Sequence, residues 1–512
     1  MFNLIKKLLK SKSTNFRYCK NVDNCKEKKI QDKQANDIPH DIETFEFTLK
    51  ENMKNSSDFV TRKGESVHNK RFIISYIDGL VSKDLIDRDI IKPLVSNSKE
   101  DNIEKCLYES GINEITDISE ATNQLLLGNT LVYLAGNNVA YSIDLKTFDK
   151  RSINEPNAES VVRGAREGFV ENLRTNTSLL RRKIKDKNLA LESINIGKRT
   201  QTIIEIAYIE DIVNKGVLKE VKRRLSLIDT DAILESGYIE QFIEDNPYSI
   251  VSTVGNTQKP DVVAAKILEG RVAIFCDGTP HVLTVPHLFI ENIQTSEDYY
   301  TRPYLATFLR LIRFMALFIS ILLPSLYVDF QTYDQEMIPT TLLITMASSR
   351  EGVPFPALVE ALIMVFLFEL LKESGLRLPK TVGSAVSIVG ALILGEAAVS
   401  AGLVSAPMVI VVAATAVASF ILPSLNETIV FYRIFFLFLS GFMGLLGISC
   451  GLVVIVVQAL SLRSFGVPYT SPASPIDKEG MKDYLIRFPL WKIIFRPKSI
   501  VKNNVIRQRN KR

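Results

Sequence analysis

The sequence predicts an α/β soluble region of two subdomains, followed by a polytopic α-helical transmembrane domain. Charge is unevenly distributed along the 512 residues. Residues 1–304 hold 43 Lys+Arg and 45 Asp+Glu, residues 305–461 hold 7 and 9, and residues 462–512 hold 12 and 3. The middle stretch consists mostly of apolar runs, and a helix of roughly 20 apolar residues can cross a bilayer. The net charge of +5 therefore originates in the carboxyl-terminal tail.

Five segments follow from these shifts in composition. We expect a basic and polar linker at 1–40, α/β subdomains at 41–155 and 156–300, a transmembrane helical domain at 301–461 and a basic cytoplasmic tail at 462–512. The amino terminus, MFNLIKKLLK, lacks the apolar core of roughly 7–15 residues that a secretory signal needs. The front half is therefore expected in the cytoplasm.

Within the front half, strand and helix patterns alternate. Residues 71–80 and 200–209 predict strands, 129–144 two strands joined around Gly136, and 271–286 a hairpin bent at Gly278. Apolar residues spaced three and four apart predict helices at 99–110, 171–187 and 215–228.

Neither an enzyme nor a cofactor or metal site is indicated. The sequence has no glycine-rich nucleotide loop and no HExxH motif, and its four histidines and five cysteines are scattered. The most basic segment, 161–187, includes Arg163, Arg166 and Arg174. Because acidic residues interleave with these arginines, a solvated or subunit-contacting helix face is favoured over a nucleic-acid site.

Five apolar segments are candidate spans: 305–328, 356–371, 382–403, 408–422 and 429–460. Arg310 and Arg313 lie near the start of the first span, from where they could reach the headgroups. The last segment is too long for one upright span, so it is either strongly tilted or broken into a hairpin near Gly441, Gly444 and Gly447. The basic tail and the basic 372–380 loop are expected inside, and 329–336 outside. Because the front half and the tail are both expected inside, the number of spans should be even. The five candidate segments give an even number only if the last one forms that hairpin or if 337–349 is re-entrant.

Segment 382–403 carries a stripe of small residues. Such a stripe permits close helix packing, and it also suits a narrow pore wall around a symmetry axis. The candidate pore-lining residues are Ser384, Val386, Ser387, Val389, Leu392 and Glu396.

Carboxylates in or beside apolar spans are costly unless they face water, protein or a cation. Glu360, Glu336 and Asp329 are therefore candidate ion-pathway carboxylates. A structural ion pair or a position at the membrane surface is the alternative for Glu360, as it is for Glu369 and Glu396.

Long blocks of the sequence resemble one known family. They include SVVRGAREGFVENLRTNTSLLRRKIK (160–185), LEGRVAIFCDGTPHVLTVP (268–286), DYYTRP (298–303) and the continuous stretch 336–424. These residues are similar to the A-subunit family of the GerA-type spore germinant receptors of endospore-forming bacteria, over about residues 58–463.

The resemblance implies a receptor subunit in the inner membrane of the dormant spore. It further implies a nutrient-binding B subunit and a lipoprotein C subunit as partners, and a homo-oligomer forming a nutrient-gated channel for monovalent cations. A secondary transporter and a membrane-anchored signalling scaffold remain the alternatives. The transporter is disfavoured because no internal repeat is visible in 305–460.

Overall fold

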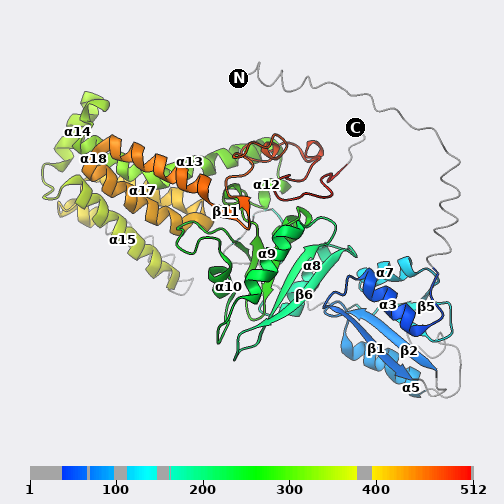
Figure 1. The fold of residues 1–512 in the computed structure, drawn as a ribbon. Helices are drawn as coiled ribbons and strands as arrows, with labels where there is room; N and C mark the ends of the chain where they lie inside the picture. Colours follow the sequence, from blue (N-terminus) through cyan, green and yellow to red (C-terminus); the bar gives the residue numbers. More distant parts are fainter. Residues whose placement is uncertain are drawn as a thin grey trace, which may run out of the picture. The chain divides into compact units, whose positions relative to one another are not determined.

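A computed structural model describes residues 37–65, 70–96, 112–146, 159, 161, 163–377 and 395–508. Its contacts divide the chain into two compact units, Met1–Met53 with Phe59–Thr147, and Lys54–Asp58 with Phe148–Arg512 (Figure 1). The subdomain boundary predicted at 155–156 and the helix predicted at 99–110 lie outside the described residues.

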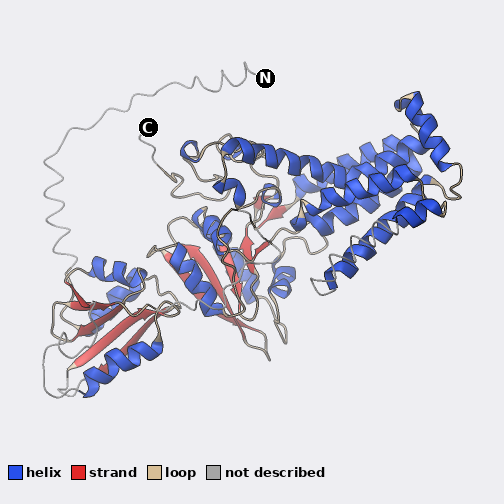
Figure 2. Cartoon of the chain, turned by 180° about the vertical axis from the view of Figure 1, so that it is seen from behind, coloured by secondary structure: helices blue, strands red, loops and turns tan. Residues whose placement is uncertain are grey.

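The first unit is a five-stranded antiparallel sheet packed with helices (Figures 1 and 2). In chain order it contains α3 (Ile42–Asn52), β1 (Phe59–Glu65), β2 (Arg71–Ile77), α4 (Lys83–Leu85), η1 (Ile86–Ile91), α5 (Lys92–Ser96), β3 (Ile112–Ile115), α7 (Ile118–Leu126), β4 (Thr130–Leu134) and β5 (Ala140–Ile143). The strand order is β1-β2-β4-β5-β3. Strands β4 and β5 are buried throughout; α7 packs against both, and Phe45 of α3 stacks on Tyr133 of β4.

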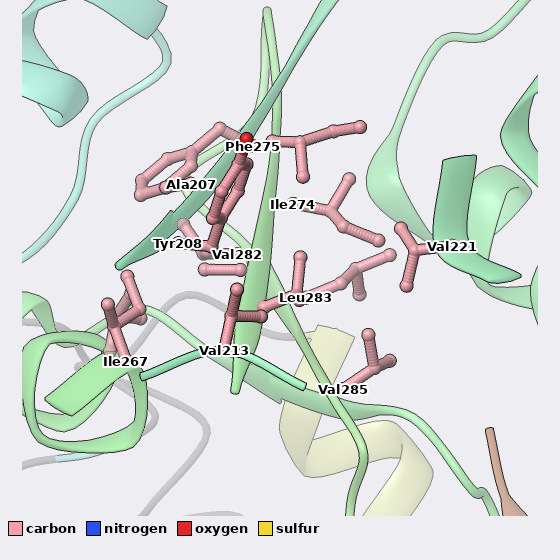
Figure 3. Packing of buried hydrophobic residues seen from close by; sticks show 14 of the residues in the cluster. Ala207, Tyr208, Val213, Val221, Ile267, Ile274, Phe275, Val282, Leu283 and Val285 are labelled. Carbon is pink, nitrogen blue, oxygen red and sulfur yellow. The ribbon is translucent and has the colours of Figure 1, made fainter. Parts of the chain in front are cut away.

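The second unit begins with an α/β region of the same plan. It contains α8 (Leu173–Lys183), β6 (Leu189–Ile196), β7 (Thr202–Ile209), α9 (Lys215–Ser226), α10 (Ser236–Ile243), β8 (Gly255–Thr257), α11 (Pro260–Leu268), β9 (Val272–Cys276) and β10 (Val282–Val285). Its strand order, β6-β7-β9-β10-β8, repeats that of the first sheet, and all its pairings are antiparallel. The two α/β regions therefore share one topology. Figure 3 shows part of the apolar core that fills the second region, where Ile274 and Leu283 face α9 through Val221.

The carboxyl-terminal segment is folded onto this second α/β region. A small ladder of β11 (Arg463–Ser464) and β12 (Val467–Pro468) follows the last long helix. Ser464 Oγ donates to the carbonyl of Thr253 at 2.7 Å and accepts from His287 N at 2.9 Å. Ile500 and Val501 lie fully inside the same apolar core. The segment predicted only as a basic tail thus contributes to the core of the α/β region.

The remaining helices form a bundle (Figures 1 and 2). They are α13 (Pro303–Thr332), α14 (Thr340–Arg350), α15 (Ala357–Arg377), α17 (Ala406–Phe420) and α18 (Asn426–Ser461), with the short α12 (Glu297–Tyr300) leading in. Among the described residues, two helices are long and apolar enough to cross a membrane, Pro303–Thr332 and Pro423–Ser461, and Ala406–Phe420 is a shorter apolar helix.

Helix α18 doubles back on itself. Gly444 has a φ of 60°, which breaks the helix into two arms. Tyr432 Oη lies 3.2 Å from Gln458 Oε1 across these arms, although 26 residues separate the two. Gly451 lies so close to Phe436 that a Cβ there would approach its ring to 2.7 Å. Of the two alternatives for this segment, the structure has the hairpin, at one of the predicted glycines.

The predicted hairpins in the α/β region are confirmed. Strands β4 and β5 pair across the turn at Gly136, and β9 and β10 pair across the turn at Gly278. Both glycines have a φ near +88°, the left-handed region in which a side chain is strained. The sequence analysis missed β1, β3, β6 and β8.

Candidate functional site

A buried ionic joint connects the α/β region, the first bundle helix and the carboxyl-terminal segment. Asp298 of α12 accepts from Arg310 Nε at 2.9 Å and, with both carboxylate oxygens, from Arg313 at 2.9 Å. Arg310 also binds Asp483 Oδ1 at 2.9 Å, and Asp483 accepts from Tyr299 Oη at 2.8 Å. Arg310 and Asp298 are 0% and 1% exposed. A buried charge is tolerated only when it is paired and hydrogen-bonded, as it is here.

A second buried ionic cluster joins α11, the start of β9 and the segment that follows β10. Arg271 forms an ion pair with Glu291, and Lys266 reaches the other oxygen of this carboxylate at 3.1 Å. Burial alone would raise the pKa of Glu291, but the charges of Arg271, Lys266 and His287 hold it well below its ordinary value. Arg271 also donates to the carbonyl of Pro286 at 2.9 Å. The loop from β10 to α12 is thereby fixed to the sheet.

Inside the bundle, an arginine–glutamate pair links three helices. Arg433 of α18 is 1% exposed and donates to the carbonyl of Ser320 in α13 at 2.9 Å and to Glu369 of α15 at 3.2 Å. Lys372 pairs with the same glutamate at 3.1 Å and also donates to Asn426 at 2.7 Å. Glu369 therefore has the structural role that was one of its two predicted alternatives.

Glu360 anchors the start of α17. Its Oε1 accepts from both the backbone N and the Oγ of Ser405 at 2.6 Å, and Ser405 Oγ lies 3.2 Å from Tyr327 Oη. Arg350 Nε lies 3.5 Å from Glu360 Oε2. A carboxylate at a helix amino terminus accepts hydrogen bonds from the free N–H groups there and interacts favourably with the positive end of the helix dipole.

Asp329 lies at the end of the bundle where α18 turns back. It is fully buried, and neither carboxylate oxygen has a well-formed hydrogen bond. A Cβ at Gly444 would lie 3.0 Å from Asp329 Oδ1, so glycine is needed for this close approach as well as for its φ. Tyr333 Oη donates to the carbonyls of Gly441 and Phe442 at 3.1 and 3.2 Å, which fixes the turn against α13.

The remaining residues predicted to line the pore or the ion pathway lie in different parts of the chain. Glu336 is exposed in a short 3-10 turn, and Glu396 is exposed on the helical stretch 395–400. Five candidate pore residues lie outside the described residues: Ser384, Val386, Ser387, Val389 and Leu392.

The three predicted subunit-contact arginines also differ from one another. Arg163 and Arg166 are exposed. Arg174 binds the buried Glu205 at 2.8 Å, so its guanidinium is used within the subunit. Glu205 also accepts from Ser57 and Ser193, each at 2.9 Å.

Sequence reasoning missed the arginine of α8 that organises this region. Arg181 is 1% exposed, pairs with Asp58 at 2.7 Å and donates to Ser56 Oγ at 2.8 Å. This explains why Lys54–Asp58 belongs to the second unit. The available signal was weak, because Asp58 lies 123 residues away in the sequence.

Together, the α/β region and the apolar bundle, with its two helices long enough to cross a membrane and its internal charges, are typical of a membrane-associated protein. In the part of the chain that the structure describes, no group of three or more His, Cys, Asp or Glu side chains could hold a metal ion. The chain matches the family model described as Bacillus/Clostridium GerA spore germination protein over residues 47–499. It therefore belongs to the GerA family of spore germination proteins.

Individual relatives agree with this assignment. The chain is 46% identical to spore germination protein KA of Bacillus subtilis (strain 168), over 90% of this chain and 86% of the relative. It is 41% identical to the uncharacterized membrane protein YfkQ of the same organism, over 89% and 92%, and 36% identical to spore germination protein GerLA of Bacillus cereus, over 86% and 92%.

Solved structures similar to part of this chain are also known. One of them is the N-terminal domain of the A subunit of the Bacillus megaterium spore germinant receptor GerK3, which is 33% identical and covers 49% of this chain and 97% of its own length, with a TM-score of 0.38.

Proposed function

We propose that this chain is the A subunit of a nutrient receptor in the spore inner membrane, and that copies of it assemble into a nutrient-gated channel for monovalent cations. The observation that carries the proposal is the buried joint at Asp298. It ties the first bundle helix, through Arg310 and Arg313, to the α/β region and the carboxyl-terminal segment. Movement of the α/β region would therefore be transmitted directly to α13.

The two ends of the bundle differ in a way that fits a multi-pass arrangement. One end lies against the α/β region, where Thr428 Oγ1 donates to the carbonyl of Ile250 at 3.0 Å. The other end carries Asp329 and the Gly444 turn. With the α/β region and the tail in the cytoplasm, α13 runs outward, and the two arms of α18 run outward and back. The buried charges then lie between helices, where ionisable groups are tolerated within a membrane.

In this proposal the pore wall is segment 382–403, and Asp329 and Glu336 are carboxylates at the outer mouth. Glu336 is exposed and attracts cations directly, whereas the buried Asp329 does so once the open state hydrates it. The partners are a nutrient-binding B subunit and a lipoprotein C subunit, with further copies of this chain. Arg163 and Arg166 are proposed contacts between subunits.

Planar-bilayer recording of the full-length chain, reconstituted with its proposed partners in a K⁺ gradient, tests this function. We expect unitary current steps whose conductance or open probability changes in Val389→Ala. The matched control is Val359→Ala, which makes the same change at an exposed position of α15 and should leave the steps unaltered. Neutralising the outer carboxylate in Asp329→Asn should lower cation conductance.

Two outcomes would replace the proposal. Substrate-dependent uptake without current steps would identify a secondary transporter that uses carboxylates such as Glu360. A membrane-anchored scaffold would give neither signal, and Glu360→Gln and Asp329→Asn would change only the abundance of the protein.

A further inference from the structure

A group of apolar side chains on the α/β region is exposed although its surroundings are well packed. Tyr238 and Phe242 of α10 are 46% and 52% exposed, and Tyr248 and Ile250 in the following loop are 97% and 41% exposed. We call these four residues the α10 patch. Exposed aromatic residues that lie together mark a contact surface more often than isolated ones do.

Helix α10 has three distinct faces. Ile239 and Ile243 are fully buried in the core. Glu240 Oε1 and Glu244 Oε1 lie 2.8 and 3.0 Å from Ser252 Oγ, whose single proton they share. Tyr238 and Phe242 are four residues apart and therefore share a face, which points roughly opposite to the glutamates at 100° per residue. The helical part of the α10 patch, Tyr238 and Phe242, is consequently aromatic and shares its face with no charged residue of α10.

The α10 patch adjoins the base of the bundle. The carbonyl of Ile250 accepts from Thr428 in the first turn of α18, and Val251 packs with Tyr432 and Phe436. One turn beyond Thr428, α18 begins a row of exposed rings at Phe431, Phe435, Phe438 and Phe442. The patch therefore lies at the level where the apolar outer surface of the bundle begins.

We infer that the α10 patch rests in the cytoplasmic headgroup region of the membrane, with Tyr238, Phe242 and Tyr248 reaching the boundary of the acyl chains. Tyrosine suits this position because its ring is apolar and its hydroxyl remains hydrated. The carboxylates of Glu240 and Glu244 are turned toward Ser252 and Thr253, so they do not have to enter the bilayer. The patch would hold the α/β region against the bilayer surface beside α18. The contact with lipid requires that the bundle spans the membrane, and its assignment to the cytoplasmic side rests on the proposed function.

Quenching of tryptophan fluorescence by brominated lipid tests this contact. The chain has a single tryptophan, Trp491, whose emission in the unaltered protein can be subtracted. The full-length Tyr248→Trp variant is placed in nanodiscs of phosphatidylcholine and phosphatidylglycerol, with or without bromine on the acyl chains. We expect the added emission to fall by about half or more in the brominated discs, because interfacial rings lie within reach of the upper acyl carbons.

Leu227→Trp is the matched control. Leu227 is 66% exposed at the carboxyl-terminal cap of α9, so its added emission should be unchanged by bromine. Phe242→Trp provides a second position on α10 and should be quenched like Tyr248→Trp. The inference is overturned if neither variant is quenched more than Leu227→Trp. It is equally overturned if both are shielded by an added receptor subunit instead of by lipid, which would make the patch a protein contact.

Discussion

Asp298→Asn should destabilise the joint between α12 and α13 more than any surface charge change would. Both carboxylate oxygens accept from arginine, Oδ1 from Arg313 and Oδ2 from Arg310 and Arg313. In either orientation an asparagine amide would point its NH₂ group at a guanidinium donor. The substitution therefore removes the negative charge and also sets donor against donor, in a site that is 1% exposed.

The expected loss of unfolding free energy depends on which partners Arg310 and Arg313 keep in the variant. Breaking a buried ion pair costs about 3–5 kcal/mol, because the partner charge stays buried. Arg310 keeps Asp483 at 2.9 Å, and Arg313 is 12% exposed and can be partly hydrated, so we expect the lower end of this range, about 3 kcal/mol. In thermal unfolding of a chain of 512 residues this corresponds to a fall of about 3 °C.

The assay is thermal unfolding of the full-length protein in nanodiscs, followed by loss of the monodisperse species. Glu297→Gln is the matched control, because it removes the same charge from the neighbouring residue of α12. Asp298→Asn melting within about 1 °C of Glu297→Gln would refute the reasoning, since it would mean that the joint contributes little to stability.

Three further predictions concern other parts of the molecule. Arg433→Met should shorten the half-life of the detergent-solubilised protein at 40 °C several-fold, whereas Arg377→Met, at an exposed ion pair, should not. About 1–3 kcal/mol is at stake, because the buried carbonyl of Ser320 loses its donor while Glu369 keeps its ion pair with Lys372. Gly444→Ala should lower the melting temperature, because a side chain is strained at a φ of 60° and its Cβ would lie 3.0 Å from Asp329 Oδ1. Gly352→Ala is the control and should leave the melting temperature unchanged, because a Cβ there meets nothing within 4 Å. Equal melting temperatures for the two variants would contradict the hairpin at Gly444. Burial raises the pKa of Glu46, but Lys50 and Lys63, each at 2.6 Å, outweigh this and lower it to about 2 from 4.5, so its contribution to stability is complete above about pH 4.5 and is lost as the pH falls toward 2. In the unaltered protein the urea midpoint for unfolding of the first unit should fall as the pH is lowered from 4.5 to 2. In Glu46→Gln this fall should be smaller. If the midpoint changes equally with pH in both proteins, the ion pairs of Glu46 do not contribute to stability.

The architecture was predictable where a signal is local. The turns at Gly136 and Gly278 are marked by glycine between β-branched runs, and both hairpins form. The break in the last long segment was also indicated by its glycines and its length. These features depend on residues within a few positions of each other.

The ionic joint was not predictable, because its members are far apart in sequence. Arg310 and Asp483 are separated by 173 residues. From the sequence, Arg310 and Arg313 are cations near the start of an apolar helix, and such cations usually extend toward the headgroups. The structure instead pairs both with Asp298 and buries Arg310 completely, since α12 and the carboxyl-terminal segment cover this part of α13. Arg433 is similar: its role depends on a carbonyl of α13 and a carboxylate of α15 that no local pattern connects to it.

The use of ion pairs at these positions has a consequence for how the bundle could move. Apolar side chains of similar volume would hold the helices at least as tightly, because the desolvation of two charges offsets much of their attraction. An apolar contact, however, weakens gradually as two surfaces slide. An arginine held between a carbonyl and a carboxylate keeps one register, as Arg433 does between Ser320 and Glu369. Leaving that register exposes a buried charge, so intermediate positions are costly and the helices would shift between discrete arrangements. In the proposed function, a receptor that must stay closed through dormancy and then open would use such an all-or-none response, and the joint at Asp298 would place the same constraint where α13 meets the α/β region.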